Sequence, residues 1–509
     1  MSSKYRVDKS KAGQDPLDVS RRAMLQVTAA TTIAAPIVAH GGQADAVDPP
    51  LIEGYAGRRS VVTGETVTFH VSTNVEKFDV RIVRLGLETT TVWQKKGVPG
   101  ERFAVPEHAT SHGCDWPETF DVTIPSEWTS GCYEARLIAK QGDTPVAGNP
   151  IFFVVRSSHP GRDAKILLQL STNTYNAYNG WGDYSLYKYW GVWDVVHEPG
   201  DLLGRRVTFK RPFGGIDRTW ELPFIRWAES AGYSIDYAIN SDLEFHPEML
   251  QHYKLVLSVG HDEYWSAPMR DHLEAYIAGG GNVAFFSGNV SCWQVRSEAD
   301  GNDLVCWKEA YEQDPLYNQA GPNRLLTTLW SHHLVHRPEN QMTGVGVLRG
   351  GFHNYEDIFK DDGGYSVHQP DHWVFAGTGL TEGQKFGEPD TIVGYEVDGC
   401  EFNLVDGRPV PTGRDGTPAD FTILATAPAR WGFKDVGWYK EWVEPWQQRE
   451  HDHGCMGIYT KPGGGTVFTA ATTDWSHGLG TFAEAGQPPR PADPVVVQMT
   501  RNVLQRLSA

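Results

Sequence analysis

Three short, continuously apolar segments most constrain the fold of this chain. They are KILLQLS (165–171), KLVLSVG (254–260) and NVAFFSG (282–288). Uninterrupted apolar runs of this length are typical of strands buried on both faces of a parallel sheet. Helical patterns at 222–232 and 266–281 alternate with them. The segments therefore predict an α/β domain with an open, mostly parallel sheet and helices on both faces.

The region before these segments has a different pattern. TVTFHVST (66–73), FDVRIVRLG (78–86) and CYEARLIAK (132–140) alternate apolar and polar residues and are separated by turn-forming residues. This pattern predicts a small all-β, immunoglobulin-like sandwich over residues 50–157. The turn-rich stretch SSHPGRDA then leads into an α/β domain over residues 160–509, with a loop-rich or β-rich insertion at about 300–460.

The first 46 residues have the features of an export signal. Arg21 and Arg22 precede a mildly apolar run, and Ala44-Asp45-Ala46 follows as a cleavage pattern. This order predicts a twin-arginine signal peptide, with a secreted, periplasmic or cell-surface location; the alternative is a disordered basic leader. No other apolar run approaches the ~20 residues that span a bilayer, so we expect no membrane association after cleavage.

Charge and cysteine spacing exclude some classes of function. The formal net charge of −18 disfavours a nucleic-acid partner. The six cysteines include no C-x-x-C pair, which argues against a thiolate zinc site. Export permits disulfides, and Cys114 with Cys132 and Cys292 with Cys306 are the sequence-local candidates.

Polar residues follow the predicted strands where the strands end. His261-Asp262-Glu263 comes directly after the second apolar run, and Asn289 follows the third. Ligands of open α/β sheets bind beyond the carboxyl ends of the strands, so these side chains are expected at one site. The alternative for the first group is a solvated turn in which Asp262 caps the next helix.

Five tyrosines occur in STNTYNAYNGWGDYSLYKYW (171–190). Clustered tyrosines are more often packed aromatics with satisfied hydroxyls than ligands. A strongly charged cation changes that expectation, because it can lower the pKa of a phenol from its usual ~10. Two tyrosinates and one carboxylate would match the charge of a ferric ion.

The motifs together resemble a known family. TYNAYNGWGDYSLY (174–187), VGHDEYWS (259–266), AGGGNVAFFSGN (278–289), VGYE (393–396) and TTDWSHGL (472–479) are similar to the large, catalytic subunit of N,N-dimethylformamidase and its relatives. The resemblance implies a class I glutamine-amidotransferase-like catalytic domain. The strand end that carries a nucleophilic cysteine in that fold reads HDEYW here, so cysteine chemistry is disfavoured.

The resemblance also implies a cofactor, a mononuclear Fe(III). Its ligands by motif position are Tyr175, Tyr187 and Glu263, and Tyr178 is the alternative to Tyr175 because both occur in the same element. The spacing between the two tyrosine elements is compact and an export signal is present. These two departures from the dimethylformamidase type leave the substrate open.

Three further residues fall in the pocket that the resemblance implies: His261, Asn289 and Glu396. In the expected reaction a ferric ion acts as a Lewis acid on an amide, His261 or Glu396 serves as general base, and Asn289 donates a hydrogen bond to the oxyanion. Glu263 belongs to both the catalytic and the metal set.

The sequence thus predicts an exported, iron-dependent hydrolase of small carboxamides such as N,N-dimethylformamide. The competing hypothesis is a non-enzymatic, aromatic-rich protein that binds carbohydrate. A homo-oligomer and a small accessory subunit are both compatible with the sequence.

Overall fold

The computed structural model describes residues 51–141, 144–187, 204–319, 321, 323–353, 363–388, 392–430, 451–480 and 489–509. The predicted signal peptide lies outside the described residues and stays a prediction. Within the described part of the chain, no helix is both long and apolar enough to cross a membrane.

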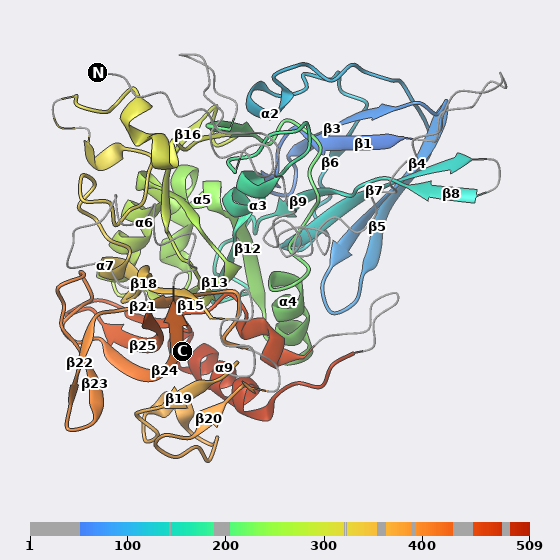
Figure 1. Ribbon diagram of the computed structural model, residues 1–509. Helices are drawn as coiled ribbons and strands as arrows, with labels where there is room; N and C mark the ends of the chain where they lie inside the picture. The colour runs from blue at the N-terminus through green and yellow to red at the C-terminus, as the bar shows by residue number, and fades with distance from the viewer. Residues whose placement is uncertain are drawn as a thin grey trace, which may run out of the picture.

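The N-terminal strands form two sheets that share one core (Figure 1). Residues such as Phe69 and Val71 of one sheet pack with Ile82 and Leu137 of the other. The first sheet contains β1 (Ile52–Ala56), β3 (Thr66–Thr73) and β6 (Phe120–Thr123). The second contains β2 (Ser60–Val61), β4 (Lys77–Leu85), β5 (Thr90–Pro99), β7 (Gly131–Gln141), β8 (Thr144–Ala147) and β9 (Ile151–Val155). A short helix, α2 (Ala109–His112), lies between β5 and β6 in the chain.

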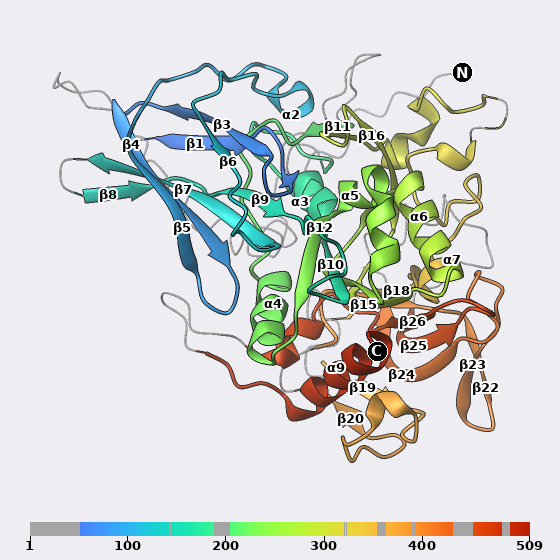
Figure 2. The ribbon, with the colours of Figure 1, turned by 180° about the vertical axis from the view of Figure 1, so that it is seen from behind.

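The largest sheet begins with a run of parallel strands in the order β12-β10-β13-β15-β26. Leu255, Leu257 and Val259 of β13 belong to one core and Val256 to another, so the strand is buried on both faces. Helices cover both faces of this part of the sheet, as the front and back views together show (Figures 1 and 2). The strands are β10 (Ile166–Leu170), β12 (Ile235–Ile239), β13 (Leu255–His261), β15 (Asn282–Gly288) and β26 (Thr466–Thr469). The first core includes residues of α4 (Glu221–Ser230) and α9 (Pro494–Leu507), and the second includes residues of α5 (Asn240–Phe245) and α6 (Ala267–Ala278).

The rest of the same sheet is antiparallel. It continues through β25 (His451–Thr460), β24 (Thr422–Arg430), β18 (Gly346–Phe352) and β21 (Glu396–Gly399), and β19 (Tyr365–Val367) joins β24 to β20 (Lys385–Phe386). The predicted fold, an open, mostly parallel sheet of the class I glutamine-amidotransferase type, is therefore wrong. The sheet is mixed, and most strand pairings in the described chain are antiparallel. The error lies in residues 300–460, where the predicted insertion instead supplies strands that extend the main sheet.

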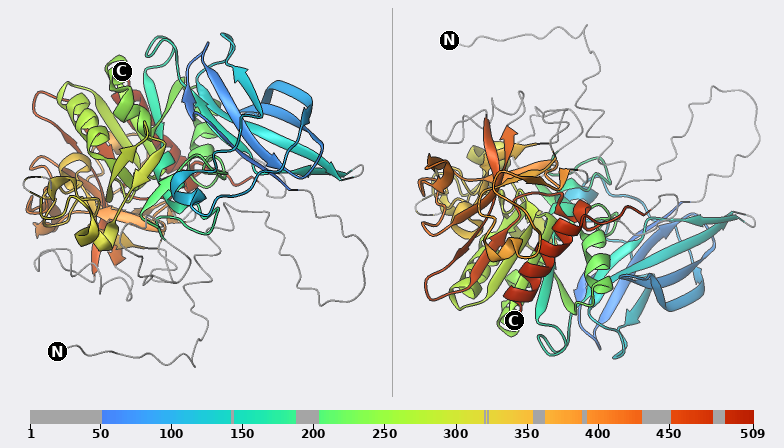
Figure 3. Two further views of the ribbon diagram at one scale, coloured as in Figure 1. Left: turned by 90° about the horizontal axis from the view of Figure 1, so that it is seen from above. Right: turned by 90° about the horizontal axis from the view of Figure 1, so that it is seen from below.

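The N-terminal strands, blue to cyan, lie to one side of the rest of the described chain (Figure 3). The other elements are short. One small sheet has the order β11-β17-β16-β14, from β11 (Arg206–Thr208), β14 (Tyr264–Ser266), β16 (Trp293–Glu298) and β17 (Asp303–Val305), and β22 (Phe402–Val405) pairs with β23 (Arg408–Pro411). The remaining helices are α3 (Thr172–Tyr178), α7 (Asn340–Thr343), η1 (Pro247–His252), η2 (Lys308–Gln313), η3 (Asn323–Leu325), η4 (Trp373–Phe375) and η7 (Trp475–Leu479).

All six cysteines are buried free thiols. Neither of the candidate disulfides suggested by sequence proximity is present. Burial raises the pKa of Cys132 and Cys292 well above the usual value of a thiol, which keeps both in the unreactive, protonated form.

One buried carboxyl outside the strand ends makes stability depend on pH. Glu339 is 1% exposed and accepts a hydrogen bond from Ser331, and burial raises its pKa from 4.5 to about 7. A raised carboxyl pKa stabilises the fold fully below about pH 4.5, and the contribution is lost as the pH rises through 7. The measurement is the free energy of unfolding of Glu339→Gln and of wild type by denaturant at pH 4.5 and at pH 8. The difference between the two proteins should shift in favour of the variant by on the order of 3 kcal/mol from the lower to the higher pH. A stability difference that does not change with pH would contradict this assignment.

Candidate functional site

The site begins with two tyrosines brought together by a short loop. Tyr178 is the last residue of α3, and the amide of Leu186 donates to the carbonyl of Ala177, so that the chain returns alongside the helix. The rings of Tyr178 and Tyr187 stack with their centroids 4.4 Å apart, and their hydroxyl oxygens are 2.8 Å apart. Two phenol oxygens therefore face the same point.

Glu263 supplies a carboxylate at that point. It lies two residues after the end of β13, and its own amide donates to the hydroxyl of Thr174 at 2.9 Å, which ties it to α3. Its Oε1 lies 2.8 Å from the hydroxyl oxygen of Tyr187 and accepts a 2.8 Å hydrogen bond from the indole of Trp293. Its Oε2 makes no hydrogen bond with the described residues, and the imidazole of His261 is its ion-pair neighbour.

Three more residues lie beside this carboxylate: His261 at the end of β13, Asn289 directly after β15 and Glu396 at the start of β21. His261 Nε2 lies 2.8 Å from Glu396 Oε2 and 3.3 Å from Glu263 Oε2. Asn289 donates to Glu396 Oε2 at 3.0 Å. Burial opposes the charge on His261, but the two carboxylates outweigh it and raise its pKa to about 9. His261 therefore holds a proton between two acidic groups.

Backbone geometry explains why Glu396 reaches this position. It is the first residue of β21, and its carbonyl accepts from the amide of Thr473 at 3.1 Å. A Cβ atom on Gly288 would lie 2.5 Å from the Thr473 nitrogen and 2.8 Å from the Glu396 carbonyl oxygen. Only glycine at the end of β15 allows this approach, and the next residue, Asn289, has a φ of +52°.

The structure separates one predicted ligand from the others. The ring of Tyr175 stacks on Phe213 with centroids 5.9 Å apart, and its buried hydroxyl has no hydrogen-bond partner in the described chain. Tyr178, one turn later in α3, makes the contacts expected of Tyr175. Glu263, His261, Asn289, Glu396 and Tyr187 all lie in the cluster, while Tyr189 lies outside the described residues.

Two residues of the cluster were missed by the sequence reasoning. Tyr264 donates a 2.8 Å hydrogen bond to the Tyr187 oxygen, and Lys308 Nζ lies 3.3 Å from the centroid of the Tyr187 ring. Lys308 is 1% exposed, and burial lowers its pKa while the charge of Glu263 opposes that change. Tyr264 was visible in the motif HDEYW, but Lys308 carries no local sequence signal.

The side chains of this cluster could hold a metal ion only if tyrosine phenol oxygens serve as ligands. Among the described residues, no three His, Cys, Asp or Glu side chains form a group that could hold a metal ion. Burial, and next the charge of Glu263, raise the pKa of Tyr178 and Tyr187 well above the usual value. A bound cation reverses that electrostatic balance. The residues that fit are Tyr178, Tyr187 and Glu263, whose Oε2 makes no hydrogen bond with the described residues.

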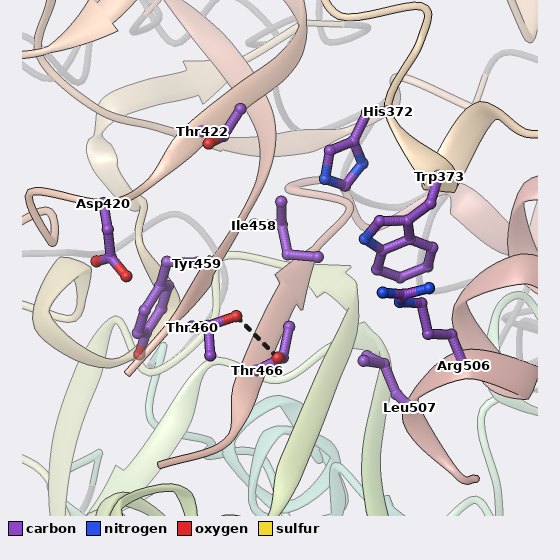
Figure 4. Close-up of a pocket in the computed structure, with 10 residues that line it drawn as sticks. All are labelled: His372, Trp373, Asp420, Thr422, Ile458, Tyr459, Thr460, Thr466, Arg506 and Leu507. Carbon is purple, nitrogen blue, oxygen red and sulfur yellow. Dashed lines mark hydrogen bonds between the residues drawn. The ribbon is translucent and has the colours of Figure 1, made fainter. Parts of the chain in front are cut away.

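A cavity elsewhere in the described chain does not coincide with this cluster. A pocket of about 300 Å³ opens between η4, β24, β25 and the end of α9, and its lining includes His372, Trp373, Tyr459 and Arg506 (Figure 4). None of its lining residues belongs to the tyrosine and carboxylate cluster.

Comparison with known proteins agrees with the motifs. Residues 79–488 match the model of the family described as N,N-dimethylformamidase beta subunit-like, C-terminal. The chain belongs to this family. Two beta subunits of N,N-dimethylformamidase, from Paracoccus aminophilus and from an Alcaligenes species, are each 23% identical to it over 366 residues. The match covers 62% of this chain and 44% of each relative, so the chain spans less than half the length of these dimethylformamidase subunits.

Proposed function

We propose that the chain is an iron-dependent hydrolase of small carboxamides, with N-substituted formamides such as N,N-dimethylformamide as the first substrates to test. The observation that carries this proposal is the meeting of two phenol oxygens and the Glu263 carboxylate beside the His261 and Glu396 pair. Membership of the dimethylformamidase family supports the same class of reaction.

A ferric ion held by Tyr178, Tyr187 and Glu263 would supply Lewis acidity toward an amide carbonyl. The ligand set offers three negative charges in a buried site, which matches a trivalent cation. The pattern of contacts favours Tyr178 over Tyr175 as the second tyrosine ligand.

The remaining residues of the cluster are suited to proton transfer. Glu396 can accept a proton from an attacking water, and the contacts of its Oε2 with His261 and Asn289 hold the carboxylate in position. His261, whose pKa is raised to about 9, can return a proton to the departing amine nitrogen. The Asn289 amide is placed to donate to an oxyanion once it exchanges Glu396 for substrate.

The alternative of a carbohydrate-binding protein gains no support from this region. Tyr264 and Trp293 are buried, and the rings of Tyr178 and Tyr187 stack on each other rather than forming an open platform. Sugar-binding aromatics need an exposed face.

The matched variants Tyr178→Phe and Tyr175→Phe test the proposal. We expect purified wild-type protein to contain one iron per chain, to absorb visible light and to release amine from at least one amide in a series from formamides to longer amides. Tyr178→Phe should lose the visible band and more than ~100-fold in amine release, because loss of a ligand exceeds the 10–100-fold cost typical of outer partners. Tyr175→Phe should retain both.

Two results would speak against this function. Colourless wild-type protein without stoichiometric iron would remove the metal from the proposal. Loss of colour in Tyr175→Phe with retention in Tyr178→Phe would reverse the ligand assignment.

A further inference from the structure

Tyr264 is a buried residue of the cluster that has no role in the proposed chemistry. It is the first residue of β14, and its backbone pairs with Trp293 of β16 and accepts from Asn173 at 3.1 Å. The side chain is 0% exposed and belongs to the core that contains Cys292 and Leu348. Packing in this core therefore fixes the position of the Tyr264 ring. The position of the hydroxyl oxygen is fixed with it.

The contact made by this hydroxyl is unusual for a core tyrosine. Buried tyrosine hydroxyls usually find a hydrogen-bond partner, and in this chain Tyr365 and Tyr459 donate to the backbone carbonyls of Ala470 and Met342, at 2.8 and 2.6 Å. Tyr264 instead donates at 2.8 Å to the hydroxyl of Tyr187, which already lies 2.8 Å from both Tyr178 and Glu263. The Tyr187 oxygen is thus the centre of a group of four oxygens.

Proton counting distinguishes Tyr264 from the other two neighbours. A phenol has one proton, so Tyr187 can donate to only one of its three oxygen neighbours at a time. Glu263 as a carboxylate is an acceptor only. Tyr264 has a proton to donate, and no other acceptor for it is seen among the described residues.

We propose that Tyr264 is a positioning residue: it donates a hydrogen bond to the Tyr187 oxygen, and so sets the direction and electron density that this oxygen presents to a bound metal. This inference rests on the proposed function, because it assigns a partner to one of the proposed ligands. Lys308 Nζ lies over the face of the same ring, 3.3 Å from the centroid of Tyr187 and 5.1 Å from that of Tyr264, whereas the Tyr264 hydroxyl contacts the ring's oxygen.

The test compares Tyr264→Phe with Tyr365→Phe in the full chain loaded with ferric iron. Both variants remove one buried hydroxyl and keep the ring. Removing a donor from a phenolate raises the energy of its electrons, so the visible charge-transfer band of Tyr264→Phe should move to longer wavelength with iron still bound at one per chain. Tyr365→Phe should keep the wild-type band.

The outcomes separate this inference from the function itself. A band unchanged in Tyr264→Phe would overturn the inference and leave the proposed hydrolase intact. Loss of the band and of iron from folded Tyr264→Phe would also overturn it, because Tyr264 would then be a ligand. Wild-type protein without iron or colour would overturn the function and the inference together.

A measurement on wild-type protein keeps the inference testable if Tyr264→Phe does not fold. The resonance Raman C–O stretch of a phenolate that accepts a hydrogen bond shifts when the donor is deuterated. We expect a shift between H₂O and D₂O for the iron-loaded protein. No shift would overturn the assignment of Tyr264 as donor.

Discussion

Glu263→Gln is expected to reduce amine release by at least ~10³-fold while leaving the protein folded. The side chain combines three contacts: Oε1 meets Tyr187 and Trp293, and Oε2 faces His261. Glutamine keeps the size but removes the negative charge that a trivalent cation and a protonated imidazole both need. Turnover, iron content and visible absorption of the purified variant give the measurement.

Glu339→Gln is the matched control for this variant. Glu339 is also a buried glutamate, but it accepts from Ser331, and no hydrogen bond or ion pair given for the described residues joins it to the cluster. The Glu339→Gln variant should retain the turnover rate and the iron content of wild type. If Glu263→Gln turned over amides at the wild-type rate, Glu263 would be neither a ligand nor a charge partner of His261. If both variants lost activity equally, a general loss of folding would be the explanation.

The ends of the parallel strands could be predicted from sequence because their signal is local. Continuous apolar runs mark β13 and β15, and the polar residues that follow them, His261, Glu263 and Asn289, do meet in space. In a parallel sheet neighbouring strands end at the same edge. A residue that directly follows such a strand in the sequence is therefore expected at the site.

The antiparallel half of the sheet could not be predicted in the same way. β18 has the sequence GVLRGGF, in which three glycines hide the alternation, and its pairing with β21 contains a register shift. Antiparallel neighbours also need no helix between them, so the strand and helix alternation used for the first half gave no information here. Glu396 was assigned by motif, and its position depends on this unpredicted half.

The tyrosine segment shows a limit at the level of single residues. Tyr175 and Tyr178 share one helix and differ by three positions, and sequence spacing could not distinguish them. The distinction comes from their tertiary neighbours, because Phe213 packs on one ring and Tyr187 on the other. Such contacts involve residues 9 to 38 positions away in the sequence, which local patterns do not encode.

Arg211→Met is expected to cause the largest loss of stability among the substitutions considered, more than ~4 kcal/mol. Arg211 is 0% exposed and donates to backbone carbonyls of Asn179 at 2.9 Å, Trp181 at 2.5 Å and Tyr184 at 3.1 Å, and also to that of Thr208. Burial lowers its pKa to about 9. Removing it leaves several buried carbonyls without a donor, each at a cost of about 1–3 kcal/mol.

The same substitution should affect the site, because three of these carbonyls lie between Tyr178 and Tyr187. Hydrogen exchange of residues 179–187 should rise in Arg211→Met before the rest of the domain opens, and iron should bind more weakly. Arg211→Lys should recover only part of the loss, since an ammonium has three donors and lacks the planar fork that reaches four carbonyls.

Arg162→Met is the control for loss of an arginine. Arg162 forms an exposed ion pair with the adjacent Asp163, and such pairs contribute little to stability. We expect its unfolding midpoint to stay close to that of wild type. If Arg211→Met unfolded at the wild-type midpoint with unchanged exchange in residues 179–187, the loop that joins the two tyrosines would be held by its own packing. The distance between the phenol oxygens would then depend on the stacked rings rather than on this guanidinium.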